Sequence, residues 1–188
     1  SWTYDSCTKG VGKLCQSVTG HGITRTLVYD SLGRAASSRT DIANGSTLSA
    51  TSAVGYDAAG RVLTQTYPTG LRVRYQYTGL GLLSAVKLDT SANTTITPLP
   101  ATPGGTPGAG AVLAPQAVLW QASAVNAWGK AEQHAYGNGV NLRNTFEPQS
   151  GRLVQATAGP GSTSGVADQR YVWDSVNLLT HRNDAIGD

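Results

Sequence analysis

The sequence predicts an all-β fold, an array of short antiparallel β-hairpins, on three observations. The 188 residues include 23 glycines and 8 prolines but only 13% charged residues, a composition that favours short strands joined by tight turns. A six-residue motif recurs along the chain. Between its copies, several segments alternate apolar and polar residues, which is the period of a half-buried strand.

The motif is clearest at residues 29–34 (Tyr-Asp-Ser-Leu-Gly-Arg) and 56–61 (Tyr-Asp-Ala-Ala-Gly-Arg). Asp at the first position of a type I turn accepts hydrogen bonds from turn amides, and Gly at the fourth position tolerates a positive φ. Each copy therefore predicts a hairpin tip, in which the aromatic residue ends one strand and Arg begins the next. The residues assigned to this structural role are Tyr29, Asp30, Gly33, Arg34, Tyr56, Asp57, Gly60 and Arg61.

Looser copies of the motif lie at residues 4–14, 77–82, 146–153 and 173–178. They replace single letters, for example Thr78, Glu147 and Asn177, but they keep the order of an aromatic residue, a turn and a new strand. We therefore extend the same structural role to Tyr4, Asp5, Tyr77, Phe146, Gly151, Arg152, Trp173 and Asp174.

A second kind of turn lies between the copies, at residues 67–70 (Tyr-Pro-Thr-Gly) and 136–139 (Tyr-Gly-Asn-Gly), and Gly20-His21-Gly22 resembles another tip. These turns should point the opposite way from the motif turns. The strands between the two kinds of turn are expected near 24–29, 50–56, 61–67, 71–77, 82–88, 116–121, 131–136, 140–146, 152–157, 169–173 and 178–182.

The segment from 98 to 111 is rich in Pro and Gly and has neither apolar pattern nor bulk. We expect a flexible insertion loop there. Because the strands on either side still need one another to complete a sheet, the sequence predicts a single array over residues 1–188, interrupted by this loop.

Cys7 and Cys15 flank a turn-like segment, so opposed strands can bring the two sulfurs within bonding reach. A hairpin disulfide and two reduced thiols in a half-buried hairpin both remain open. A metal site is not expected, because two cysteines without histidines at finger spacing fall short of four ligands.

Other function classes find little support in the sequence. The net charge is +3, but the basic residues are scattered singly, which argues against nucleic-acid binding. No apolar stretch approaches the length of a membrane span, and no signal-peptide pattern is present.

His21, His134 and His181 have no partners at catalytic or metal-binding spacing, and neither a catalytic motif nor a cofactor fingerprint occurs. We therefore expect a chain without catalytic residues, cofactor or metal.

The ordered Tyr-Asp-x-x-Gly-Arg copies and the Tyr-Pro-x-Gly and Tyr-Gly-Asn-Gly turns between them closely resemble the RHS or YD repeats of bacterial RHS proteins. The resemblance spans nearly the whole chain. It implies a curved sheet that spirals round a hollow, as in insecticidal toxin-complex shells and the teneurin barrel, with tyrosines packed between successive hairpins. The family's shells usually hold a toxin domain and close with an Asp-Pro-x-Gly type cleavage signature; this chain has no Asp-Pro dipeptide, so self-cleavage is not assigned.

The resemblance implies a structural function: a section of the wall of an RHS shell that encapsulates or presents a toxin or effector domain of a secreted or cell-surface bacterial protein. Its partners would be neighbouring YD repeats of the same parent chain and the attached cargo. Exposed sheet edges also predict an edge-paired homo-oligomer. The alternative is a surface module that binds glycans or a partner protein through exposed aromatic residues or a free sheet edge. We nevertheless expect most of Trp2, Trp120, Trp128 and Trp173 to be packed between hairpins.

Overall fold

The computed structural model describes residues 1–44, 46–90, 94–96, 111–161 and 163–186. These residues form strands and turns, with no helix among them. The strands are β1 (Trp2–Tyr4), β2 (Leu14–Val18), β3 (Ile23–Tyr29), β4 (Ala35–Asn44), β5 (Ser46–Tyr56), β6 (Val62–Thr66), β7 (Arg72–Tyr77), β8 (Leu83–Leu88), β9 (Thr94–Ile96), β10 (Ala111–Leu113), β11 (Val118–Val125), β12 (Ala131–Tyr136), β13 (Val140–Phe146), β14 (Leu153–Pro160), β15 (Ala167–Trp173) and β16 (Leu179–Asp184).

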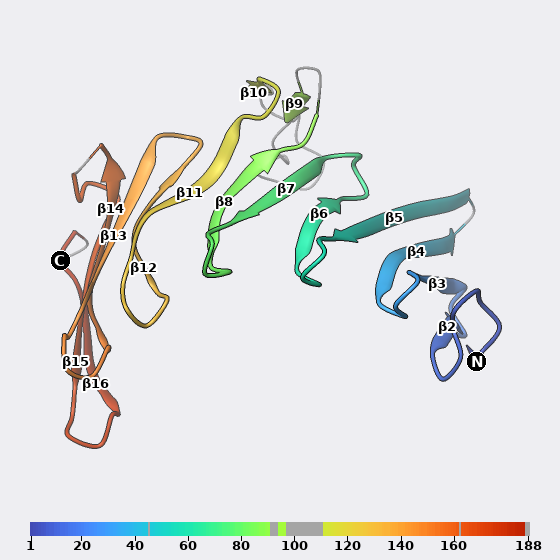
Figure 1. Ribbon diagram of the computed structural model, residues 1–188, viewed down its shortest axis with the longest axis horizontal. Helices are drawn as coiled ribbons and strands as arrows, with labels where there is room; N and C mark the ends of the chain where they lie inside the picture. The colour runs from blue at the N-terminus through green and yellow to red at the C-terminus, as the bar shows by residue number, and fades with distance from the viewer. Residues whose placement is uncertain (45, 91–93, 97–110, 162, 187–188) are drawn as a thin grey trace. The chain divides into compact units, whose positions relative to one another are not determined.

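Fourteen strands belong to one sheet and follow one another in chain order, while β9 and β10 pair with each other (Figure 1). Neighbours pair antiparallel, as β3 does with β4 and β13 with β14. Such a sheet is a row of consecutive hairpins, each joined to the next by a tight turn. The predicted fold class, all-β with antiparallel hairpins, is confirmed.

The chain divides into two compact units. Unit 1 comprises Ser1–Arg74 and Leu88–Pro115, and unit 2 comprises Tyr75–Lys87 and Gln116–Asp188. Because strand direction alternates, successive turns of each unit lie at alternate ends of the strands. In each unit, all the turns that carry motif copies lie at the same end of the strands, here called the motif edge, and the turns between copies lie at the other end, here called the opposite edge.

Several strands were not expected from the sequence, and β4 is the longest of them. Its residues include Ala, Ser, Asp and Asn, which have low strand propensity. It nevertheless pairs along its length with β3 on one side and with β5 on the other. Pairing on both sides therefore overrides local propensity at this strand. The short strands β1, β2, β9 and β10 were also absent from the expected ranges.

The Pro/Gly-rich segment predicted as a loop, residues 98–111, lies outside the described residues except for Ala111, which begins β10. Its flexibility and the single array over 1–188 therefore stay predictions.

Few side chains are fully buried, because one sheet has no second layer to cover it. Among the described residues the buried apolar side chains are Cys15, Val73, Ala85, Leu88 and Ala158. Val73 is buried in β7 while Arg72 beside it is exposed, as the alternation of that strand predicts. With so small a core, contacts between neighbouring hairpins must supply much of the stability.

Candidate functional site

The repeated motif turns are the best-defined feature of the chain. At residues 30–34, the backbone N–H of Asp30 donates to the carbonyl of Arg34 at 2.9 Å, and Gly33 N–H donates to the carbonyl of Asp30 at 3.1 Å. Asp30 Oδ1 accepts the backbone N–H groups of Leu32 and Arg34, both at 2.9 Å. Its Oδ2 accepts the Arg34 guanidinium at 2.7 Å. One carboxylate thus binds both the turn amides and the side chain of the residue directly before β4.

The turn at residues 57–61 repeats this geometry. Asp57 Oδ1 accepts two backbone N–H groups at 2.9 Å, and Oδ2 accepts Arg61 at 2.7 to 2.8 Å. Gly33 and Gly60 have φ values of 71° and 82°, the left-handed region in which Gly has no steric penalty. The two turns therefore share one hydrogen-bonding pattern.

The looser copies keep the turn with altered chemistry. Asp174 accepts the N–H groups of Val176 and Leu178, and Asn177 takes the positive φ of 69° that Gly has elsewhere. In the turn after Phe146, one residue longer, Glu147 replaces Asp and accepts hydrogen bonds from Ser150 and Arg152. In that turn Ser150 Oγ accepts the backbone N–H of Arg152 at 3.2 Å, a bond that the Asp carboxylate accepts in the other copies.

One copy was missed in the sequence. Residues 126–130 (Asn-Ala-Trp-Gly-Lys) form the same turn between β11 and β12. Asn126 Oδ1 accepts the backbone N–H groups of Trp128 and Lys130 at 3.1 and 3.0 Å, and Gly129 has φ 75°. The spacing of Asn126, Gly129 and Lys130 is that of Asp, Gly and Arg in the other copies and could have identified this turn. The copy is hard to recognise because Val125 occupies the position at which other copies have an aromatic residue.

The aromatic residue of a motif copy binds the preceding copy. Tyr29 hydroxyl donates to the carbonyl of Leu14 at 2.7 Å, and Tyr56 hydroxyl donates to that of Ala35 at 2.8 Å. Trp173 Nε1 donates to the carbonyl of Leu153 at 2.8 Å. In each case the acceptor is the residue directly after the basic residue of the preceding copy.

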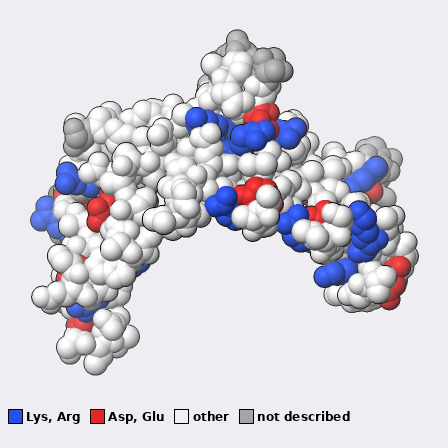
Figure 2. Space-filling model, in the orientation of Figure 1, with Lys and Arg blue, Asp and Glu red and all other residues white. Residues whose placement is uncertain are grey.

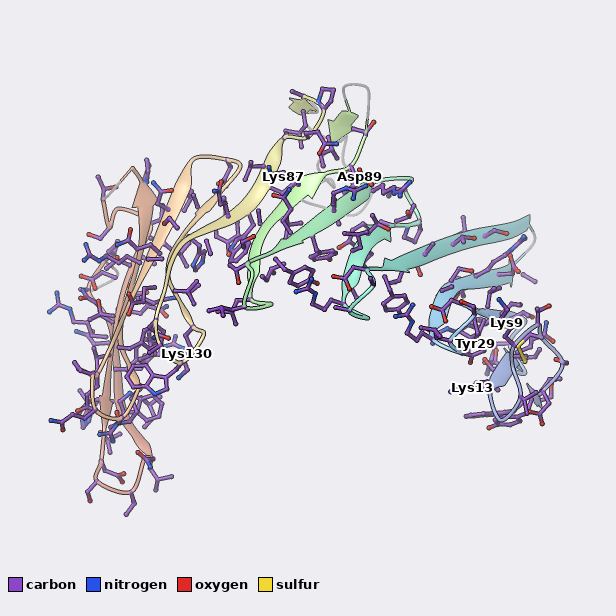
Figure 3. All side chains as sticks on the ribbon, in the orientation of Figure 1. Lys9, Lys13, Tyr29, Lys87, Asp89 and Lys130 are labelled. Carbon is purple, nitrogen blue, oxygen red and sulfur yellow. A yellow bond between two sulfur atoms is a disulfide. The ribbon has the colours of Figure 1, made fainter. Side chains whose placement is uncertain are left out.

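The basic residue of a motif copy reaches forward to the next copy. The Arg34 guanidinium lies 4.1 Å from the centre of the Tyr56 ring, and Lys130 Nζ lies 5.3 Å from that of Phe146, both within cation–π range. Lys130 also donates to the carbonyl of Gly151 at 2.8 Å, and Arg152 donates to that of Asp174 at 2.9 Å. Motif residues thus join consecutive hairpins in both directions. Figure 3 shows the side chains on the ribbon, with Tyr29 and Lys130 labelled.

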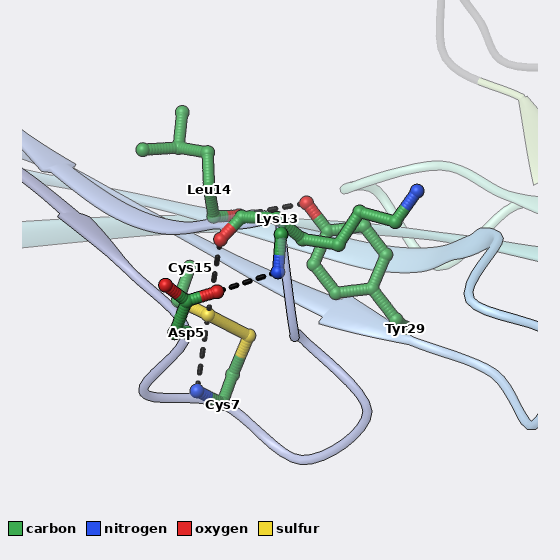
Figure 4. The surroundings of a disulfide bond; sticks show 7 residues. Asp5, Cys7, Lys13, Leu14, Cys15 and Tyr29 are labelled. Atoms are coloured by element: carbon green, nitrogen blue, oxygen red, sulfur yellow. Dashed lines mark hydrogen bonds between the residues drawn. A yellow bond between two sulfur atoms is a disulfide. The ribbon is translucent and has the colours of Figure 1, made fainter.

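The first motif turn is enlarged and closed by a disulfide between Cys7 and Cys15 (Figure 4). Asp5 N–H still donates to the carbonyl of Lys13 at 3.1 Å, and Asp5 Oδ1 accepts the N–H of Gly12 at 2.5 Å. A Cβ at Gly10 would overlap both sulfur atoms, so Gly is required beside the disulfide. The extra residues of this turn therefore leave the hydrogen bonds of Asp5 to Lys13 and Gly12 in place.

Two of the motif carboxylates, Asp30 and Glu147, have pKa values below the ordinary range of their residue types. Hydrogen bonds from the backbone and side chain of Arg34 outweigh partial desolvation and lower the pKa of Asp30. Hydrogen bonds from Ser150 and then from Arg152 lower the pKa of Glu147. A lowered pKa suits a carboxylate that holds a turn, and it is the opposite of the raised pKa that a general acid needs at neutral pH.

The three histidines belong to different elements. His21 is in the turn before β3, His181 is exposed on β16, and His134 is on β12 between Trp120 and Tyr136. Desolvation lowers the pKa of His134, and its Nδ1 is buried without a hydrogen-bond partner. Within the described ranges no three His, Cys, Asp or Glu side chains are grouped to hold a metal ion, and no helix is long and apolar enough to cross a membrane.

The tryptophans only partly follow the expectation that most are packed between hairpins. Trp173 and Trp120 are half-buried, but Trp2 and Trp128 are mostly exposed. Trp2 lies on β1, which pairs only with β2 among the described strands. Trp128 lies at a hairpin tip, where a single-layer sheet offers little cover.

This chain is similar to known proteins both in the sequence of one repeat and in its fold. Residues 56–95 match the RHS Repeat family. The crystal structure of TcdB2-TccC3 superposes with a TM-score of 0.70 and 18% identity over 98% of this chain. The Tc holotoxin pore of Photorhabdus luminescens gives a TM-score of 0.66 and 20% identity over 94%, and TcdB2-TccC3 without its hypervariable C-terminal region gives 0.66 and 19% over 94%.

This chain spans 9% of the first of those structures and 8% of the other two. No curated protein sequence matches it. The repeated motif turns, the family match that includes the copy at Tyr56, and the array of antiparallel hairpins agree with one another. Residues 56–95 are therefore an RHS repeat, and the array of hairpins that contains them has the fold of the solved structures named above.

Proposed function

We propose that this chain is a section of the wall of an RHS shell that encapsulates or presents an attached toxin or effector domain of a secreted or cell-surface bacterial protein. The observation that carries the proposal is the use of the motif side chains. Tyr56 binds the preceding hairpin, and Arg34 is shared between its own turn and the ring of the next copy. Side chains used in this way hold neighbouring hairpins together, as the wall of a shell requires.

The solved structures support the proposal through their fold. They are far longer than this chain, which corresponds to less than a tenth of their length. A row of hairpins joined by neighbour contacts is suited to form part of a larger continuous sheet, since each new hairpin adds the same contacts again. Encapsulation of an attached domain is the function that such a wall would serve here.

The test uses the full-length protein that carries this array together with its attached domain. Limited proteolysis should leave the attached domain intact in the wild type. The protease should cut that domain faster in the double variant Tyr29→Phe and Tyr56→Phe, which lacks two of the hydrogen bonds between hairpins. Tyr67→Phe, in a turn between copies, is the matched control. An attached domain that is cut as fast in the wild type as when it is isolated would contradict the proposal.

A second candidate function is a surface module that binds glycans or a partner protein. It is favoured by an aromatic cluster in unit 2, where the His134 ring lies 5.7 Å from Trp120 and 5.6 Å from Tyr136 between ring centres. Tyr136 is 42% exposed. Exposed aromatic rings can stack on the apolar faces of sugars or anchor a protein partner.

The discriminating experiment is titration of the purified chain with a panel of glycans, followed by intrinsic tryptophan fluorescence and calorimetry. Binding should weaken at least about tenfold in Tyr136→Ala, and it should be unchanged in Tyr67→Ala, a tyrosine of comparable exposure in unit 1. If no glycan binds, the glycan form of this candidate is excluded and the wall function is unaffected.

A further inference from the structure

Two arginines of unit 1 share one carboxylate. Arg72 Nε lies 3.0 Å from Asp89 Oδ2, and Arg74 Nε lies 3.2 Å from Asp89 Oδ1. Both arginines belong to β7 and alternate with the buried Val73, so their side chains leave the same face of the sheet. The backbone N–H of Asp89 also donates to the carbonyl of Arg72 at 2.8 Å. In Figure 2 basic side chains flank a small acidic area in the region where Figure 3 labels Asp89.

This cluster carries an excess of positive charge. The other ion pairs of the described residues join one arginine to one carboxylate, as at Arg39 and Asp41. Here two guanidinium groups and one carboxylate leave one positive charge unbalanced, and the two like charges repel each other. The Asp89 side chain is only 13% exposed, whereas those of Arg72 and Arg74 are 51% and 38% exposed. The excess charge therefore lies at the surface.

Two threonine hydroxyls lie on the same face, directly opposite the arginines. β6 pairs with β7 so that Thr64 faces Arg74 and Thr66 faces Arg72. Directly opposed residues of antiparallel strands have Cβ atoms about 5 Å apart. A hydroxyl can rotate to donate toward a ligand on this face. The two pairs thus bring two cationic and two neutral donor groups together.

The next strand leaves space beside these donors. β5 places Ala53 opposite Thr66 and Gly55 opposite Thr64. A Cβ on Gly55 would lie 2.5 Å from Thr64 Oγ1. Gly55 has no positive φ, so backbone conformation does not require glycine. A glycine within a strand is typical of a β-bulge or of a place where a ligand comes close.

The β-bulge between Gly55 and Tyr56 does not account for the glycine. The strands that end in two other motif aromatics have the same irregularity, and there valine occupies the position of Gly55: Val28 before Tyr29 and Val172 before Trp173. A larger side chain is therefore accepted at this position of a motif strand. The small residue at Gly55 is peculiar to the strand beside Thr64.

We propose that Arg72, Arg74, Thr64 and Thr66 form a binding site for a sulfate monoester group, such as a sulfated sugar carries. Asp89 binds each arginine through Nε, which leaves the terminal Nη groups of both for a ligand. A sulfate monoester has one negative charge, equal to the excess of the cluster, and three free oxygens that can accept from guanidinium and hydroxyl groups.

Other common anionic groups match the cluster less well. A carboxylate has two oxygens, which one guanidinium fork already satisfies. A phosphate monoester carries about 1.5 to 2 negative charges, more than the excess of one positive charge balances. A phosphate diester carries one charge but has only two free oxygens. The number of donor groups and the charge therefore both favour the sulfate monoester.

The test titrates the purified chain with methyl sulfate and follows the backbone amide and arginine Nε–H signals by NMR. Saturable shifts should occur at β6, at β7 and at Asp89. Arg72→Gln and Arg74→Gln should each weaken binding at least about tenfold. Arg143→Gln is the matched control, because Arg143 is an exposed arginine of unit 2 outside this cluster, and this variant should bind like wild type.

A second pair of variants leaves every charge in place. Thr64→Val and Thr66→Val remove the hydroxyls but keep a β-branched side chain that suits a strand, and each should weaken binding by about threefold. Thr51→Val is the matched control, since Thr51 lies opposite Arg39, whose charge Asp41 balances. These variants test the site even if an arginine variant fails to fold.

Acetate and inorganic sulfate are the comparison ligands, and methyl sulfate should bind more tightly than either. Equal affinity for acetate would show attraction by charge alone, and higher affinity for inorganic sulfate would assign the site to the free dianion. Either result would overturn the proposal. Methyl sulfate that causes no saturable shift, or that binds the arginine and threonine variants as it binds wild type, would do the same. The proposal rests on neither function proposed above.

Discussion

The aromatic residue of the motif contributes a polar group as well as a ring. Tyr29 and Tyr56 donate through a hydroxyl, and Trp173 donates through an indole N–H, each to a backbone carbonyl of the preceding hairpin. Phe146 has no such donor, and there Lys130 lies over the ring instead. A ring with a polar tip is suited to a thin sheet, because it covers apolar surface and also binds a neighbouring backbone group.

Tyr56→Phe should lower the free energy of unfolding by about 0.5 to 1.5 kcal/mol, the usual net contribution of one hydrogen bond. The change removes only the hydroxyl that donates to the Ala35 carbonyl. Urea denaturation followed by circular dichroism measures the effect. Tyr67→Phe should change stability much less, and equal losses in the two variants would contradict the role of the Tyr56 hydroxyl.

The motif carboxylates predict how stability depends on pH. The pKa values of Asp30 and Glu147 are lowered by their hydrogen bonds. A carboxyl group whose pKa is lower in the folded than in the unfolded chain stabilises the fold above its unfolded pKa, and that stabilisation is lost as the pH falls through the folded pKa. The melting temperature should therefore fall as the pH drops below about 4. The decrease should be smaller in Asp30→Asn, and an unchanged pH profile in that variant would contradict the assignment.

At the scale of the element, a motif turn needs one residue with positive φ. Gly60→Ala should destabilise the chain by about 1 to 2 kcal/mol, since Ala in the left-handed region brings its Cβ too close to the backbone. Gly79→Ala is the control, because Gly79 lies in another motif turn without a positive φ and with open space around its Cβ position. Thermal unfolding of the two variants gives the comparison, and similar melting temperatures would show that the turn tolerates the strain.

The strands themselves depend on pairing more than on local propensity. Arg72–Tyr77 could be recognised because its alternation is regular, and its bounds agree with β7. Ala35–Asn44 could not, because its small and polar residues have low strand propensity. That strand is held by β3 and β5 and by a polar cluster in which Arg39 and Ser49 both donate to Asp41.

At the scale of the whole molecule, each hairpin contacts its neighbours in the row. A local change should therefore remain local, as expected for a repeat array. Reduction of the Cys7–Cys15 disulfide should increase hydrogen exchange in β1 and β2 and leave β13 and β14 protected. Mass spectrometry of deuterated peptides with and without a dithiol reductant measures this. A loss of protection throughout the chain on reduction would contradict a nearest-neighbour array.

The sequence by itself determined the hairpin array and most positions of the motif turns, because Asp and Gly in a turn act through contacts within five residues. It also placed Cys7 and Cys15 where a bond was possible. Only the tertiary structure showed that these two cysteines are joined and that Asn126 begins another motif turn. It alone also showed that Tyr56 contacts Arg34 and Ala35 of the preceding hairpin. The physical reason is range: a turn is encoded by adjacent residues, whereas contacts between hairpins depend on the register in which separate strands pair.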